Sequence, residues 1–104
     1  MYQGTTPTIV LTVEGADLDE STCYVTIKCG LGKIITKSGN ELAVSGNEIA
    51  VHLTQEDTLQ FSPGHCEIQV RWIDANGNAM ATEIVNLDVD RVLLKKIIEY
   101  QGEG

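Results

Sequence analysis

The chain has 104 residues, and seven basic against fifteen acidic side chains leave a formal net charge of −8. With 42% hydrophobic residues it is expected to fold as one domain over residues 1–104, and a disordered chain is excluded. Direct binding to nucleic acid or to an anionic membrane is also excluded, because both partners carry negative charge.

Apolar and polar residues alternate along most of the chain, and this period of two predicts β-strands. Seven strands are expected, at 9–13, 23–29, 33–37, 42–44, 49–53, 66–72 and 80–89. The second and sixth strands show the clearest alternation. Their inward positions are Cys23, Val25, Ile27 and Cys29 in the second strand, and Cys66, Ile68, Val70 and Trp72 in the sixth.

The residues between the sixth and seventh strands have the composition of a tight turn. Asn76-Gly77 accepts positive φ at both central positions of a type I′ turn, so a two-residue hairpin is predicted. The seventh strand changes its apolar phase between Ile84 and Val85, which predicts a bulge or bend there. Its inward set would be Met80, Thr82 and Ile84, followed by Val85, Leu87 and Val89.

Two segments carry helical patterns. Thr54 is a good N-cap residue, and Glu56 and Asp57 follow it in the first turn, so one helical turn is expected with Leu59 and Phe61 tucked inward. Beyond Asp90, apolar pairs four residues apart are compatible with a short C-terminal helix, and an extended arm fits equally.

Seven short strands separated by frequent turns indicate an all-β fold. The expected architecture is a single antiparallel immunoglobulin-like β-sandwich with one short helical turn and an apolar C-terminal extension or arm over residues 91–104. The Cys-Trp-Cys spacing of true immunoglobulin domains is absent, so the topology within the sandwich class is left open.

The cysteines and the N-terminus indicate where the protein is made. Residues 1–6 lack the basic and apolar regions of a signal peptide, and no run of residues is long and apolar enough to span a bilayer. The cytoplasm is therefore the expected compartment of synthesis. In that reducing compartment Cys23, Cys29 and Cys66 are expected to be buried thiols, in a core that needs neither metal nor disulfide.

The search for chemistry in the sequence is negative. The cysteines and histidines lack zinc-site spacing, and the neighbours His65 and Cys66 point to opposite faces of a strand, which separates nucleophile from base. Residues 74–78 begin like a calcium loop, but the glycine comes too early and the twelfth position is Val85. No catalytic, cofactor-binding or metal-binding residue is assigned, no cofactor is expected, and the protein is not expected to be an enzyme.

The least explained feature is a C-terminal group of large aliphatics: Val92, Leu93, Leu94, Ile97 and Ile98. Two interpretations of this group are open. They close an edge of the sandwich, or they form an interface with a neighbouring subunit, since exposed apolar patches usually mark interfaces. Lys33 and Lys37 resemble the charges that keep an edge strand from pairing with another chain.

Three stretches resemble a group of small proteins encoded among the tail and baseplate genes of phages and prophages in Firmicutes. They are Tyr2-Gln3-Gly4-Thr5-Thr6-Pro7-Thr8, Leu53-Thr54-Gln55-Glu56-Asp57-Thr58-Leu59 and Glu67-Ile68-Gln69-Val70-Arg71-Trp72. The pattern is also similar to the N-terminal β-sandwich domain of phage baseplate upper proteins. This resemblance implies a structural protein of the tail or baseplate that contacts other tail subunits or its own copies. It also implies synthesis in the bacterial host cytoplasm and, for a structural protein, a place in the tail or baseplate of the virion.

A function of another class is kept open beside this one. A small acidic protein made by a prophage can imitate the charge of nucleic acid and inhibit a host defence protein by occupying its basic cleft. The acidic residues are spread along the sequence, which favours the structural interpretation.

Overall fold

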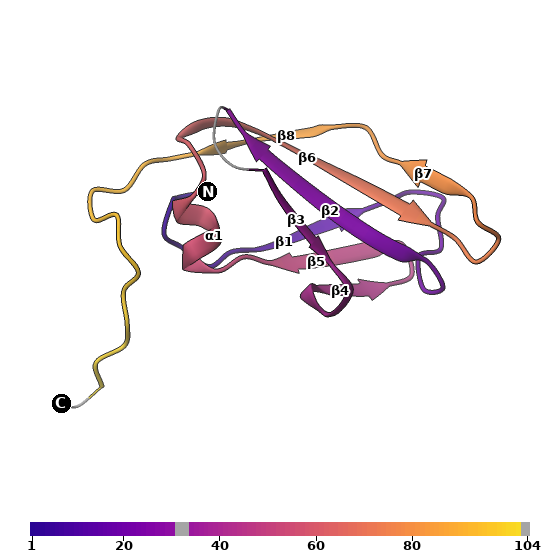
Figure 1. Cartoon of the computed structure of the whole chain (residues 1–104), viewed down its shortest axis with the longest axis horizontal. Helices are drawn as coiled ribbons and strands as arrows, with labels where there is room; N and C mark the ends of the chain where they lie inside the picture. Colours follow the sequence, from indigo (N-terminus) through magenta and orange to yellow (C-terminus); the bar gives the residue numbers. More distant parts are fainter. Residues whose placement is uncertain (31–33, 103–104) are drawn as a thin grey trace.

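The computed structural model describes residues 1–30 and 34–102 and contains eight strands, one α-helix and one 3₁₀ helix within them (Figure 1). The strands are β1 (Thr8–Thr12), β2 (Thr22–Cys29), β3 (Ile34–Ser38), β4 (Leu42–Ser45), β5 (Glu48–His52), β6 (Gly64–Ile73), β7 (Ala79–Ala81) and β8 (Val85–Val89). The helices are η1 (Gly39–Glu41) and α1 (Gln55–Leu59). The expectation of an all-β fold with antiparallel sheets is confirmed at this level.

The strands form two antiparallel sheets (Figure 1). The smaller sheet has the order β1-β5-β4, and the larger has β3-β2-β6-β7, with β8 pairing β6 beside β7. Buried side chains from both sheets belong to one hydrophobic cluster, with Phe61 and Leu18 among its largest members. The alternation predicted for β2 and β6 is confirmed, because Cys23, Val25, Ile27 and Cys29, and Cys66, Ile68, Val70 and Trp72, are all buried.

The expected seventh strand is divided into β7 and β8, which is why eight strands are present and not seven. Arg71 pairs with Ala81 and Ile68 with Val85, so the β7–β8 side holds one residue more than β6 between these pairs. That extra residue is a β-bulge, and it confirms the predicted break in the strand. The inward assignment is wrong at Met80, Ile84 and Val85, whose side chains are exposed.

The predicted hairpin joins β6 to β7, but its turn is of another type. Only Gly77 has positive φ, whereas a type I′ turn requires it at Asn76 as well. The Gly77 amide donates to the Asp74 carbonyl at 3.0 Å, and the Asp74 amide donates to the Asn78 carbonyl at 3.0 Å. This is the pattern of a type I turn closed by a glycine bulge, and it lets Asp74 cap the turn with its carboxylate.

The helical turn begins as predicted. The Thr54 hydroxyl accepts from the Asp57 amide at 3.1 Å, and the Asp57 carboxylate accepts from the Thr54 amide at 2.9 Å, which completes a capping box. The same carboxylate accepts from Lys37 Nζ at 2.9 Å, and the two side chains are only 12% and 14% exposed. Lys37 lies on β3, an edge strand of the larger sheet, and its side chain turns inward to α1. Its edge-protecting role stays a prediction, since charged residues that point inward also discourage edge pairing. Lys33 lies outside the described residues.

The expectation that all three cysteines are thiols is wrong for two of them. Cys29 and Cys66 form a disulfide, and Cys23 is a free, buried thiol. The reason is strand register: Cys29 and Cys66 are direct partners in the β2–β6 pairing, with Cα atoms 4.1 Å apart. The inward alternation that buries both residues therefore also places their sulfur atoms side by side.

The C-terminal helix is absent from residues 91–102, and the alternative interpretation of this segment, an extended arm, is the correct one. The arm leaves the body after β8 and runs along the α1 end of the molecule (Figure 1). A helix needs a surface on which to bury its apolar stripe.

Among the described residues, no helix is long and apolar enough to cross a membrane.

Candidate interaction surface

The base of the arm is fixed by the N-terminal residues. The Gln3 amide donates to the Asp90 carbonyl at 2.9 Å, and the Asp90 amide donates to the Met1 carbonyl at 2.7 Å. The Gln3 side chain is buried, and its Nε2 donates to the Phe61 carbonyl at 2.7 Å. These bonds tie the first three residues to the end of β8, so the arm starts from a rigid point.

A second anchor lies farther along the arm. Gln55 Nε2 donates to the Ile98 carbonyl at 2.8 Å, and the Ile98 amide donates to Gln55 Oε1 at 2.8 Å. One side-chain amide thus pairs with both backbone groups of one residue, as a neighbouring strand would. The arm is held at its base and at Ile98, and the segment between these points follows the α1 end of the body.

The five predicted interface residues all lie on this arm, but they do not form a closed cluster. Val92 is half-buried, in the vicinity of Gly4 and Leu59. Leu93 is 91% exposed and Leu94 is 59% exposed. Ile97 and Ile98 are also more than half exposed. The backbone of the arm is therefore anchored while most of its apolar side chains remain in solvent, which is the arrangement of a presented binding segment.

Replacing Gln55 with alanine is expected to release the outer half of the arm without unfolding the body, because both hydrogen bonds to Ile98 disappear. Amide hydrogen exchange at residues 96–100 should accelerate by about tenfold, a change of roughly 1.4 kcal/mol in local opening. Gln60→Ala is the matched control, since Gln60 is a half-buried glutamine whose side chain donates to the Glu56 carbonyl within its own helical segment. Equal exchange in both variants would show that Gln55 does not hold the arm.

The opposite end of the molecule is acidic. The loop between β1 and β2 and the turn between β6 and β7 lie together there (Figure 1). A hollow of about 420 Å³ at this end has Val13, Ala16, Trp72 and Met80 in its apolar lining, and its carboxylates are Glu14, Asp17 and Asp74. An adjoining hollow adds Asp19 and Glu20. We call these two hollows the acidic end.

Part of the acidic end is built by its own hydrogen bonds. Asp19 accepts from the Gly46 amide at 2.8 Å, and Asp17 accepts from the Asp19 amide at 3.1 Å. Backbone hydrogen bonds from Asn78 and Asn76 hold the pKa of the Asp74 carboxyl below its ordinary value. Hydrogen bonds thus hold three of the carboxylates of this end in place, those of Asp17, Asp19 and Asp74.

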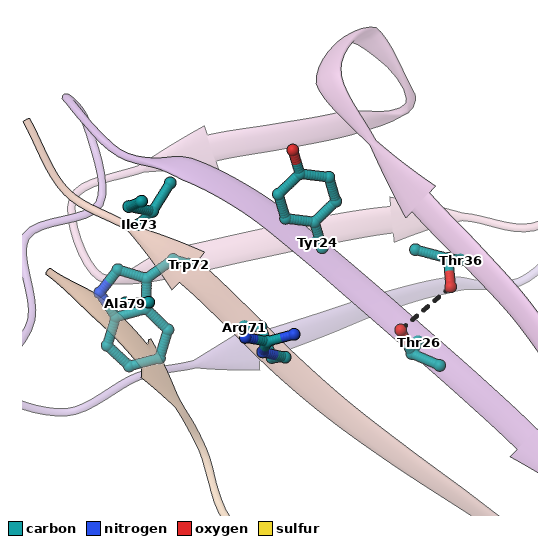
Figure 2. A pocket seen from close by; sticks show the side chains of 7 residues that line it. All are labelled: Tyr24, Thr26, Thr36, Arg71, Trp72, Ile73 and Ala79. Atoms are coloured by element: carbon teal, nitrogen blue, oxygen red, sulfur yellow. Dashed lines mark hydrogen bonds between the residues drawn. The ribbon is translucent and has the colours of Figure 1, made fainter. Parts of the chain in front are cut away.

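A third hollow, of about 500 Å³, lies on the outer face of the larger sheet (Figure 2). Tyr24 and Arg71 project from neighbouring strands there, and Thr26 and Thr36 are joined by a 3.1 Å hydrogen bond. Within the described part of the chain, no ion pair includes Arg71. The hollow offers an open, mixed surface and no pair of groups arranged as nucleophile and base.

Comparison with models of known protein families, with curated proteins and with solved structures found no match to this chain. Its interpretation therefore depends on its own residues. No group of three or more metal-ligating side chains occurs in residues 1–30 and 34–102. His65 is exposed beside Asn86, and its neighbour Cys66 is buried in the disulfide.

The anchors of the arm and the acidic end were not predicted from the sequence. Gln3 and Gln55 lie in two of the three stretches quoted above for their resemblance to other proteins, and that position is the one signal that could have pointed to them as contact residues. The acidic end combines residues 14–20 with Asp74, and this proximity follows from the β2–β6 pairing of Thr22 with Ile73. Nothing local in the sequence indicates that pairing.

Proposed function

We propose that this protein is a non-enzymatic structural component of a phage or prophage tail or baseplate, and that it works by binding other protein subunits through its C-terminal arm. The observation that carries the proposal is the anchored arm with exposed aliphatic side chains. Unanchored apolar tails would be expected to collapse onto the body, whereas Gln3 and Gln55 hold this one by its backbone. The resemblance in three stretches of sequence supports the tail or baseplate setting.

We further propose that the two sheets are the halves of an immunoglobulin-like β-sandwich. The order β1-β5-β4 corresponds to strands B, E and D, and β3-β2-β6-β7/β8 corresponds to C′, C, F and G. Both sheets contribute to one buried cluster, which is what a sandwich core requires. The disulfide departs from the immunoglobulin pattern, because it joins two strands of the same sheet.

The setting is tested by fractionating phage particles. An epitope-tagged copy is expressed in a host that produces the particles, and the particles are purified on a density gradient and analysed by mass spectrometry. We expect the wild type and Val10→Asp to co-purify with the tail proteins and Leu94→Asp to be reduced by at least about tenfold. Val10 is the matched control, since it is 57% exposed and lies on β1 away from the arm.

Circular dichroism of the purified variants checks that Leu94→Asp keeps its fold, as expected for a residue already exposed to water. If the wild type stays in the supernatant while tail proteins sediment, the protein is not a particle component. If Leu94→Asp co-purifies as well as Val10→Asp does, the arm is not the contact.

One observation favours the second candidate function, a small acidic inhibitor of a host defence protein. The structure brings Asp74 beside the four carboxylates of residues 14–20, so five carboxylates meet at the acidic end. This candidate predicts salt-sensitive binding to a basic nucleic-acid-binding protein, measured by calorimetry at two salt concentrations. Glu14→Lys combined with Glu20→Lys should abolish that binding, and Leu94→Asp should not change it.

A further inference from the structure

The charge of the chain is divided between the body and the arm. Residues 1–90 hold thirteen acidic and four basic side chains, whereas residues 91–98 hold three basic side chains and no acidic one. The three basic residues are Arg91, which precedes the first three aliphatics of the arm, and Lys95 and Lys96, which separate these from Ile97 and Ile98. The arm is thus an apolar and basic segment on an acidic protein.

The arm and the acidic end lie at opposite ends of the molecule. The principal dimensions are 52 × 34 × 18 Å, and in Figure 1 the arm lies at one end of the long axis while the β6–β7 turn lies at the other. Gln55 holds Ile98 beside α1, so the arm cannot reach the acidic end of its own chain while this anchor is closed. Any arm that docks at the acidic end must come from another molecule.

The acidic end has the chemistry that the arm needs. Met80 and Trp72 are among the apolar residues that line its hollow, and Glu14 and Asp17 are among the acidic ones. Leu93 and Leu94 on the arm can bury apolar surface against such a lining, and Lys95 and Lys96 follow directly to meet the carboxylates. The two hollows on the outer face of the larger sheet offer less, since Arg71 lines one and Lys28 the other, and Glu67 is the one acidic residue among their lining residues.

We propose that the arm of one molecule docks on the acidic end of a second copy of this chain. The two contacting surfaces are different, so the interface is heterologous and each molecule keeps one free arm and one free acidic end. Repetition of the contact yields a ring or a filament of copies. This inference rests on the proposed function, because both assign the arm to protein contacts. It adds the partner, which is a second copy of the chain, and the surface, which is the acidic end.

The test is a charge swap between two variants of the full chain. The first carries Lys95→Glu and Lys96→Glu in the arm, and the second carries Glu14→Lys and Glu20→Lys at the acidic end. Glu14 and Glu20 enter no side-chain hydrogen bond or ion pair of residues 1–30 and 34–102, so these changes should leave the fold intact. Sedimentation velocity over a concentration series gives the self-association constant of each variant and of their mixture.

Each variant alone is expected to self-associate at least about tenfold more weakly than the wild type, because the reversed charges meet like charges. The equimolar mixture should recover association, since an acidic arm then meets a basic end and the reverse. Glu83→Lys is the matched control, an exposed acidic residue on the bulge away from both surfaces, and it should associate as the wild type does. Added NaCl should weaken wild-type association without any substitution.

Two results would overturn the inference. A wild-type protein that is monomeric at every concentration has no such contact. Acidic-end variants that associate as strongly as the wild type would show that the arms meet each other or another surface. Both results leave the particle fractionation unaffected, so a monomeric protein that still co-purifies with particles contradicts the self-docking alone.

Discussion

Asp57→Ala is expected to lower the free energy of unfolding by about 3 kcal/mol, measured by urea denaturation. The substitution removes the capping box of α1 and leaves Lys37 almost buried without its nearest carboxylate. Glu41 lies 3.5 Å from Lys37 and is half exposed, so it compensates only weakly. Asp88→Ala is the control, because the Asp88 side chain is 84% exposed and its loss should change stability by less than about 0.5 kcal/mol.

The same pair determines a pH dependence. Burial alone would raise the pKa of Asp57, but hydrogen bonds from Thr54 and Lys37 outweigh it and hold the pKa below the ordinary 3.8. Hydrogen bonding to Asp57 raises the pKa of Lys37 despite its desolvation. Because the pKa of Asp57 is lower in the folded protein than in the unfolded chain, its charged carboxylate stabilises the fold at any pH above the pKa of the unfolded state. This contribution is present at neutral pH and is lost as the pH falls below about 4. The stability difference between wild type and Asp57→Asn should shrink in that acidic range, and a constant difference down to pH 2 would contradict the assignment.

Removing the disulfide by Cys29→Ala with Cys66→Ala is expected to cost about 2–4 kcal/mol of unfolding free energy, since the bridge closes a loop between residues 37 positions apart. Denaturation of oxidised protein with and without reductant should show a loss of similar size. Cys23→Ala is the control, because Cys23 is also buried on β2 but has no disulfide partner. The change in unfolding free energy that this substitution causes should be the same with and without reductant.

Alkylation followed by mass spectrometry tests the pairing directly. In denaturant without reductant one thiol should react, and after reduction three should react. Burial raises the pKa of Cys23, so in the folded protein at neutral pH its thiol should be slow to react. Three reactive thiols in unreduced, denatured protein would show that Cys29 and Cys66 are not joined.

The alternation of apolar residues predicted most of the strands and the buried faces of β2 and β6, because a strand buried on one face imposes a period of two on its sequence. Thr54 and Asp57 likewise identified the start of α1, since a cap acts within four residues. The bulge in the last strand was visible as a change of phase at Ile84. Each of these features depends on neighbours in the chain, which the sequence displays.

The features that were missed depend on residues distant in sequence. The disulfide needed the register that places Cys29 opposite Cys66, and the inward turn of Lys37 needed the position of α1. Asn76-Gly77 suits more than one turn type, and the position of Asp74 decided between them. For the interface, the five aliphatics were identified by composition, but the glutamines that hold the arm bond to it across 43 and 89 positions.

The hydrogen bond between Gln3 and Asp90 limits the order in which the protein can fold. Residues 1–3 pair with residues 90–92, so these contacts form only after residues 90–92 have been translated. β1 likewise pairs with β5, and β2 pairs with β6, which follow them at a distance in the sequence. Few native contacts can therefore form before β5 and β6 have been translated, and we expect the disulfide and the base of the arm to be completed late in folding.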